Sequence, residues 1–505
     1  MRGAALVALL TLTLPVLADD PVTAALAWPG TVPGMRFLAI PPEKDEEFRK
    51  VLLFSVNSTN LRNRYAEFSK VNDNLFAVHL DGPGWDPLSW EALGARNSYF
   101  RGPWIESRPE WTSLCAATAS KYPILRADEF IAKATVGGPG GYYDLLYGYG
   151  KVKTRAELLT LLGVDPRFDG LRVGGVMAFN PTVTTHGRQL YYTPGPIPHW
   201  RSDDVRSDTG RGDVLRNLNL DDGTQDDLEI AGQEYVFPLR NGLIGTFLND
   251  AAGNRVDEVP KDIARGEVNH PDGRVRAGRS CFSCHTQGIK HFVPDEHDLL
   301  RKRVVQLSTT NKALAQKFEN LFDPQAVEDL IGDGQAAFSR SMFRLTGDEQ
   351  LSGKFAAAWN GYSEARVGID DAVRECGVAT REELLPALVR LNDPNGLALI
   401  PQDGVAEKRI SRTKWEEIYP LIRWEMEHPT EDAPAPANQQ VNILTVGSST
   451  VKLPAAAKTY KSDRQDLVTV GKPVNGEYPV EVKDGATWVE FELTDGTKQR
   501  FEVRR

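Results

Sequence analysis

Residues 232–249 have the sequence GQEYVFPLRNGLIGTFLN, and the local fold of the middle of the chain follows from this stretch. Two extended runs, 233–240 and 243–249, flank Asn241-Gly242, which is the strongest short signal for a β-hairpin. Gly253-Asn254 marks the next turn. We therefore predict a small antiparallel sheet directly before a segment that contains two closely spaced cysteines.

The region before the hairpin alternates helical and extended patterns from residue 20 to about residue 225. Thr154 to Glu157 has the pattern of a capping box, and Gly163 marks the end of the short leucine-rich helix that follows. Gly137 to Tyr143 is rich in glycine, which predicts a loop. A nucleotide site there is disfavoured, because the glycines lack the strand-to-helix context of a phosphate-binding turn. These patterns predict a mixed α+β region.

The region after the hairpin is expected to be mostly helical from Asp295 to about His428, with capping boxes at Thr380–Glu383 and Thr413–Glu416. Residues 429–440 are rich in proline and have no apolar periodicity, as expected for a semi-rigid linker. Residues 441–505 alternate apolar and polar residues between Asn-Gly and Asp-Gly turns, which predicts a compact β module without evident chemistry.

The chain of 505 residues is longer than one hydrophobic core usually supports, so an α+β multidomain fold is expected. The predicted parts are a signal peptide (1–18), an N-terminal α+β domain (19–225), a β-hairpin plus mainly helical domain (226–428), a linker (429–440) and a β module (441–505). With a net charge of -10, the chain lacks the clustered Lys and Arg that nucleic acids require, which excludes them as partners.

The first residues predict export. Arg2 supplies a basic start, Ala4 to Leu17 is apolar but short, and Val16 to Ala18 places small residues where a signal peptidase cuts. The alternative is an uncleaved N-terminal anchor. No later stretch approaches the ~20 consecutive apolar residues that a membrane helix requires, so we expect a periplasmic or secreted protein without a membrane span in its mature chain.

The segment Cys281-Phe282-Ser283-Cys284-His285 has the spacing Cys-x-x-Cys-His. Two thiols at this spacing can add to the two vinyl groups at one edge of a haem, and the adjacent imidazole then lies under the iron. A redox dithiol would need a βαβ setting, and a zinc site would need a second closely spaced pair in this chain of four cysteines. A structural disulfide is the remaining alternative. The motif therefore predicts one covalent haem c on Cys281 and Cys284, with His285 as the proximal ligand.

The sixth iron ligand decides between electron transfer, which a closed iron favours, and chemistry at an open iron. Met342 is the first candidate, because it follows His285 at a separation similar to that in small methionine-ligated cytochromes c. Phe338, Met342 and Leu345 also fall at helical spacing, so Met342 is equally well explained as core. The other candidates are His291, His297, Met177, His186 and His199.

Two further groups of residues leave alternatives open. Cys115 and Cys376 either form a disulfide between two predicted domains or remain buried thiols. Arg274, Arg276 and Arg279 precede the motif and either pair with haem propionates or are solvated.

Three segments together resemble a family of large single-haem c-type cytochromes from planctomycetes and similar bacteria: Gly232–Leu243, Gly253–Asp257 and Ser280–Lys290. In that family a hairpin leads into a Ser-Cys-x-x-Cys-His segment. The resemblance extends over about residues 35 to 425 and leaves the terminal β module outside.

The resemblance implies that Cys281 and Cys284 are the haem attachment points and that His285 is an axial ligand. The family does not clearly supply a methionine at the position of Met342, and it has no agreed substrate. The haem and the compartment are therefore implied by the resemblance, while the reaction is not.

Two functions follow as expectations. The first is electron transfer between periplasmic redox partner proteins, because one motif means one electron per molecule. The second is a peroxidase-like haem oxidoreductase with an open distal site, in which His186 or His199 acts as an acid or base. A third and weaker hypothesis is a binding or sensory module that uses residues 441–505 as its contact surface.

Overall fold

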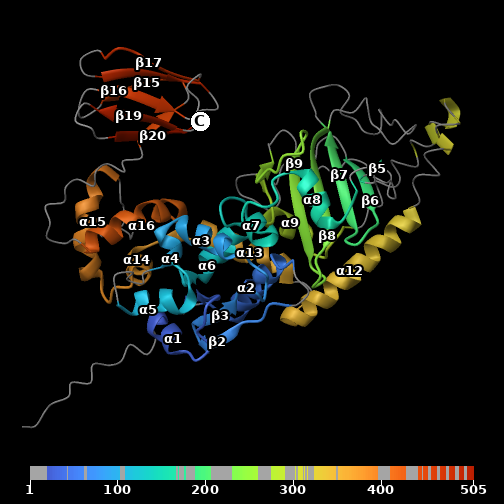
Figure 1. Ribbon diagram of the computed structural model, residues 1–505, viewed down its shortest axis with the longest axis horizontal. Helices are drawn as coiled ribbons and strands as arrows, with labels where there is room; N and C mark the ends of the chain where they lie inside the picture. Colours follow the sequence, from blue (N-terminus) through green and yellow to red (C-terminus); the bar gives the residue numbers. More distant parts are fainter. Residues whose placement is uncertain are drawn as a thin grey trace, which may run out of the picture. The chain divides into compact units, whose positions relative to one another are not determined.

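The computed structural model describes residues 20–41, 44–61, 65–102, 109–165, 188–205, 230–259, 274–290, 324–348, 351–395, 410–427 and most of 442–504. It also describes Asp169, residues 176–177 and several positions between 302 and 316. The chain has both helices and sheets and forms two compact units, one ending at Arg423 and one beginning at Trp424 (Figure 1).

The N-terminal part of the first unit is a sheet covered by helices on both faces. Its strands are β1 (Met35–Ala39), β2 (Ser69–Asn72), β3 (Leu75–His79) and β4 (Ile124–Arg126), in the order β2-β3-β1-β4. Strand β1 is antiparallel to β3 and parallel to β4. Both faces of β1 are buried, because Phe37 and Leu38 point to opposite sides and belong to separate hydrophobic clusters.

The helices of the N-terminal region are mostly short, and the last two, α7 and α8, lie by the second sheet described below. Their bounds are α1 (Pro21–Ala27), α2 (Glu46–Ser58), α3 (Pro87–Ala95), α4 (Ser98–Arg101), α5 (Pro109–Thr118), α6 (Ala127–Ala134), α7 (Tyr142–Tyr147) and α8 (Arg155–Leu162). Helices α1 and α5 contribute to the cluster on the Phe37 side, and α2 and α6 contribute to the cluster on the Leu38 side.

Helix α8 confirms the predicted capping box. The Thr154 hydroxyl accepts from the backbone N–H of Glu157, the Glu157 side chain accepts from the backbone N–H of Thr154, and Gly163 ends the helix in the left-handed conformation. The prediction of a loop from Gly137 to Tyr143 is wrong at its end, because α7 begins at Tyr142. The glycines form the turn that precedes this buried, tyrosine-rich helix.

The predicted hairpin is the core of a second, antiparallel sheet. Its strands follow chain order: β5 (Val176–Met177), β6 (Arg188–Thr193), β7 (His199–Val205), β8 (Ile230–Pro238) and β9 (Ile244–Asp250). Strands β8 and β9 pair from Gly232 opposite Asp250 to Pro238 opposite Ile244.

The hairpin turn is longer than the expected two residues. The backbone N–H of Gly242 donates to the carbonyl of Leu239 (2.9 Å), and Gly242 has φ +85°. This is a three-residue loop ending in a glycine with positive φ, so Asn241-Gly242 occupies its last two positions. The Asn241 amide explains the difference, because it donates to the backbone carbonyl of Asn57 in α2 (2.8 Å).

The outer edge of β9 is covered by tyrosine hydroxyls from α7. The backbone N–H groups of Thr246 and Leu248 donate to the hydroxyls of Tyr142 (3.0 Å) and Tyr143 (2.9 Å). The Tyr147 hydroxyl donates to the carbonyl of Thr246 (2.8 Å). An edge strand normally exposes such groups, and here side chains satisfy them.

The remaining elements of the first unit are mostly helical, as predicted. They are β10 (Glu258–Val259), β11 (Val275–Arg276), α9 (Arg279–Cys284), α12 (Pro324–Thr346), α13 (Leu351–Glu364), β12 (Arg366–Val367), α14 (Ile369–Cys376), α15 (Arg381–Asn395), β13 (Ile410–Ser411) and α16 (Arg412–Glu427). The capping box predicted at Thr413 is wrong. Helix α16 begins at Arg412, two residues before the start that a cap at Thr413 implies, and the hydroxyl of Ser411 accepts from the backbone N–H of Lys414 (3.2 Å).

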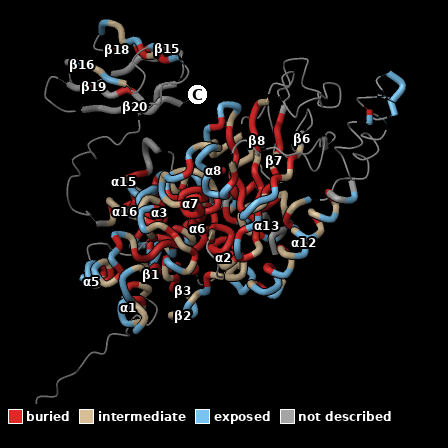
Figure 2. Tube along the Cα trace, turned by 45° about the vertical axis from the view of Figure 1, so that its right-hand side comes forward, coloured by how far each residue is buried: buried red, intermediate tan, exposed pale blue. Residues whose placement is uncertain are grey.

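One large hydrophobic cluster extends through much of the first unit, beside the separate cluster that contains Phe37. Its buried residues run from Leu38 through the α7 tyrosines and the β8–β9 hairpin to Phe355 in α13. Figure 2 shows the buried positions gathered in α2, α6, α7 and β8. The boundary predicted near residue 225 therefore does not separate two hydrophobic cores.

A buried ionic network lies at the junction of α4, α6, α14 and α16. The Glu375 carboxylate accepts from Arg412 (2.6 Å), from the Tyr99 hydroxyl (2.8 Å) and from the Trp415 indole (2.6 Å). Close by, Glu129 accepts from the Tyr362 hydroxyl. Burial and the neighbouring Glu416 carboxylate raise the pKa of Glu129 to about 8.

The second unit consists of two small sheets. One has the order β14 (Asn442–Thr445), β20 (Lys498–Arg504), β19 (Trp488–Leu493), β16 (Ala457–Ser462), and the other the order β15 (Gly447–Lys452), β18 (Glu477–Val482), β17 (Val468–Val470). Residues from both sheets, including Val480 and Phe491, form one hydrophobic cluster. The predicted turns at Asn475-Gly476, Asp484-Gly485 and Asp495-Gly496 lie outside the described residues.

None of the helices in the described ranges has the length and apolar composition needed to cross a membrane.

The Gly242→Ala substitution is expected to lower the free energy of unfolding by about 1–3 kcal/mol, because its positive φ strains an L residue and a Cβ would collide with Ser341. Gly332→Ala is the matched control. Gly332 lies in α12 with nothing within 4 Å of its Cβ position, so alanine should stabilise the helix by about 1 kcal/mol. Denaturant titrations measure both, and equal effects of the two would contradict this account of the turn.

The Glu129→Gln substitution is expected to flatten the pH dependence of stability. With its pKa raised to about 8, Glu129 stays protonated in the folded state at pH values where it ionises in the unfolded state. Folding then takes up a proton, so stability falls as pH rises from about 5 to 8. Glutamine removes this proton uptake, whereas Glu382→Gln, at an exposed position in α15, should leave the slope unchanged. Unfolding titrations at pH 5, 7 and 9 measure the slopes, and identical slopes for Glu129→Gln and the unmodified protein would refute the assignment.

Candidate functional site

The Cys-x-x-Cys-His segment forms the short helix α9, which is held in the core by Phe282. The Phe282 ring makes edge contacts with Phe54 (centroids 5.5 Å apart), Tyr142 (5.6 Å) and Phe355 (5.8 Å). At the start of α9, Gly278 has φ +78° and lies against the carbonyl of Thr135. These contacts fix the helix that presents the two cysteines.

The two cysteines are placed on one side of α9, because residues three apart are neighbours on a helix surface. Cys281 is buried and Cys284 is half-buried, and all four cysteines of the chain lie in described residues without a disulfide. The Cys281 Sγ lies 3.8 Å from Oε1 of Glu234 in β8. Burial, followed by the Glu234 charge, raises the pKa of the Cys281 thiol well above its usual range.

The His285 imidazole is oriented by its own turn. Its backbone N–H donates to the carbonyl of Cys281 (2.7 Å), and its Nδ1 lies 3.0 Å from the carbonyl oxygen of Gly288. A carbonyl accepts only from a protonated nitrogen, so Nδ1 carries the hydrogen and Nε2 keeps its lone pair. This is the arrangement in which histidine ligands of metals are usually held. Covalent haem requires two thiols for the thioether bonds and an imidazole for the iron, and this segment contains all three groups.

Glu234 was not singled out by the sequence analysis, yet it lies beside both groups. Its Oε1 is 3.9 Å from Nε2 of His285, in addition to its contact with Cys281. Cys281 and His285 therefore both lie against the face of the sheet that carries Glu234. The available signal was the single charged residue of a strand that is otherwise uncharged.

Met342 lies in α12, and its side chain is wholly buried in the main hydrophobic cluster. One turn earlier on the same helix, Phe338 lies against Gly288, whose carbonyl holds His285. Helix α12 thus passes close to the turn that holds His285, while the described contacts of Met342 are those of a core residue. Its role as sixth ligand stays a prediction.

His199 lies in β7, on the other face of the sheet from Glu234. Its ring is 5.6 Å from that of Tyr235, and successive residues of a strand point to opposite faces, which places His199 away from Glu234. His199 Nε2 instead contacts Asp169 Oδ1 (3.2 Å). Although burial acts against it, hydrogen bonding from His199 and the charge of Arg201 lower the pKa of Asp169. The structure therefore does not bring His199 to His285.

The other candidate ligands are not brought to His285 by the described contacts. Met177 belongs to β5, at the far edge of the sheet. His186, His291 and His297 lie outside the described residues.

Cys115 and Cys376 are not joined. The Cys115 thiol, on α5, lies 3.6 Å from the carbonyl of Lys121, whereas Cys376 is buried at the end of α14, where burial raises its pKa to about 12. Of the two predicted alternatives, a disulfide and two thiols, the structure contains the two thiols.

The three arginines before the motif have different surroundings. Arg274 and Arg276 both form ion pairs with Glu258 (2.7 and 3.3 Å). Arg279 stacks on the Trp359 ring, with Cζ 3.2 Å from its centroid. Arg279 and Cys281 are two residues apart, or about 200° around the helix axis, so they face opposite sides of α9.

Comparisons with known proteins identify no relative: no protein-family model, no curated protein and no solved structure matches the chain. Within the described residues, no group of three or more His, Cys, Asp and Glu side chains is arranged to hold a metal ion.

In haem-free protein, Cys284 is expected to react with iodoacetamide at pH 8 at least about tenfold faster than Cys281, because burial and a raised pKa keep Cys281 as a neutral thiol. Peptide mass spectrometry after timed alkylation measures both rates. In denaturant the rates should become similar, which is the control. Equal rates in the folded protein would contradict the described position of Cys281.

Proposed function

We propose that the chain is an exported c-type cytochrome that binds one haem c covalently through Cys281 and Cys284, with His285 as the proximal iron ligand. The observation that carries the proposal is the pairing of the Cys-x-x-Cys-His spacing with the Gly288 carbonyl, which holds Nδ1 of His285 and leaves Nε2 as the ligand atom. Export is supported by the basic and apolar residues at 2–17.

The proposed activity is electron transfer between periplasmic redox partner proteins. Haem bound in this way supplies an iron couple that takes up or releases one electron. The protein's own residues attach it, orient the imidazole and exclude water through the packing of Phe282 and the buried α9. Met342 is the proposed sixth ligand, supported by its helix, which also contacts Gly288.

The test is expression of the full chain together with the cytochrome c maturation system. We expect the denatured protein to retain one haem by mass and by in-gel haem staining, because thioether bonds survive denaturation. The Cys281→Ser/Cys284→Ser variant should lose it, whereas Cys115→Ser should keep it, since Cys115 lies on α5 in a different hydrophobic cluster. Absence of covalent haem from the unmodified chain would refute the proposal.

The same sample separates the two expected functions. A reduced low-spin spectrum that carbon monoxide does not change is the result expected for a closed iron and electron transfer. Ready carbon monoxide binding would contradict electron transfer through a closed iron and favour the haem oxidoreductase with an open distal site.

A further inference from the structure

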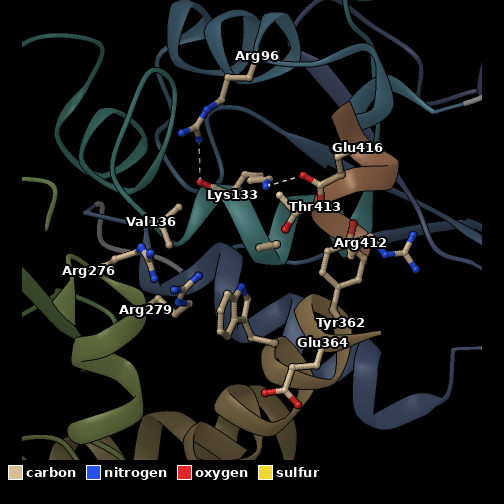
Figure 3. Close-up of a pocket in the computed structure, with 12 residues that line it drawn as sticks. Arg96, Lys133, Val136, Arg276, Arg279, Tyr362, Glu364, Arg412, Thr413 and Glu416 are labelled. Carbon is tan, nitrogen blue, oxygen red and sulfur yellow. Dashed lines mark hydrogen bonds and ion pairs between the residues drawn. The ribbon is translucent and has the colours of Figure 1, made fainter. Parts of the chain in front are cut away.

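A cavity of about 510 Å³ lies on the side of α9 opposite to Cys281 (Figure 3). It is bounded by α6, α13, α16 and the segment from β11 to α9. Its volume falls in the range of small-molecule sites. The lining residues are Arg96, Ala132, Lys133, Val136, Arg276, Arg279, Trp359, Tyr362, Glu364, Arg412, Thr413 and Glu416.

The cationic side chains of the lining outnumber the acidic ones. Arg96 donates to the backbone carbonyls of Lys133 (3.1 Å) and Gly137 (3.0 Å), which orient its guanidinium. Lys133 is paired with Glu416 (3.0 Å). Burial lowers the pKa of Arg96, although the charges of Asp257, Glu129 and Asp144 act against this shift. A bound anion would offset the remaining cost of burying the charge.

Arg276 and Arg279 line the same part of the cavity. Figure 3 shows their guanidinium groups on one side, with Arg96 across from them. Arg412 has a different role, because its guanidinium is directed away from them and pairs with Glu375 (2.6 Å). Arg96, Arg276 and Arg279 are therefore the cations that surround this part of the cavity, and Arg276 also pairs with Glu258 (3.3 Å).

This cavity is separate from the proposed haem face. Cys281 and His285 meet Glu234 on the sheet side of α9, whereas Arg279 points to Trp359 in α13. Arginine side chains form paired, charge-assisted hydrogen bonds with carboxylate and phosphate oxygens.

We propose that the cavity lined by Arg96, Arg276 and Arg279 is a binding site for a small, multiply charged oxyanion, a phosphate or a polycarboxylate. The guanidinium groups donate to the ligand's oxygens, and the indole of Trp359 forms an apolar wall beside them. This inference concerns a second site and holds whether or not the chain binds haem.

The experiment is isothermal titration calorimetry of the full chain with inorganic phosphate and with citrate, at low ionic strength in chloride buffer. Saturable binding at one site per chain is expected. Arg276→Gln should weaken binding by about tenfold or more, the scale of one charge-assisted hydrogen bond. Arg274→Gln is the matched control. It also removes a partner of Glu258 but does not line the cavity, and it should change affinity by less than about twofold.

A substitution that is expected to strengthen anion binding provides a second test. Glu364 lines the cavity and is exposed, so Glu364→Gln should tighten binding by about two- to threefold as a repulsive charge is removed. No saturable binding of either anion would overturn the proposal, and so would equal weakening by Arg274→Gln and Arg276→Gln.

A haem propionate is the other possible source of such an oxyanion. Titration of the haem-loaded protein and of the Cys281→Ser/Cys284→Ser variant separates the two sources. Equal affinity in both supports a free ligand, and binding confined to the variant would overturn it.

Discussion

The Phe282 side chain joins three parts of the chain that are distant in sequence: α2 through Phe54, α7 through Tyr142 and α13 through Phe355. A helix of six residues is too short to be stable by itself, so α9 exists because this ring is packed in the core. Each aromatic pair adds about 0.5–1.5 kcal/mol to the stabilisation from burial. The position of α9, and with it the positions of both cysteines, therefore depends on the packing of this ring.

The sequence predicted the elements whose signals are local. The α8 capping box and the β8–β9 hairpin depend on residues within a few positions of each other, and both were found. The hairpin loop and the start of α16 were misplaced by a residue or two. For the loop, the cause is the amide of Asn241, which binds Asn57 at a sequence distance of 184 residues, and no local pattern contains that partner.

The same distinction holds at the candidate site. The cysteine and histidine spacing and the Gly288 carbonyl lie within one short segment, so sequence reasoning found the motif. Glu234 lies on β8 and Trp359 lies on α13, and only tertiary packing brings them to this segment. No local sequence pattern contains these contacts. One hydrophobic cluster contains residues from both sides of the boundary expected near residue 225, for a related reason. The apolar pattern of a strand or helix predicts that one of its faces is buried. The pattern does not predict which other element packs against that face.

The hydrogen bonds between α7 and the outer edge of β9 affect how molecules of this protein can associate. A sheet edge with unpaired backbone groups can accept a strand from a second chain, which leads to domain swapping or fibre growth. The tyrosine hydroxyls of α7 already occupy the hydrogen-bonding groups of Thr246 and Leu248 on this edge. Intermolecular strand addition at β9 therefore requires α7 to detach first, and α7 is wholly buried. The tyrosine pair that begins α7 thus protects against aggregation as well as contributing to the core.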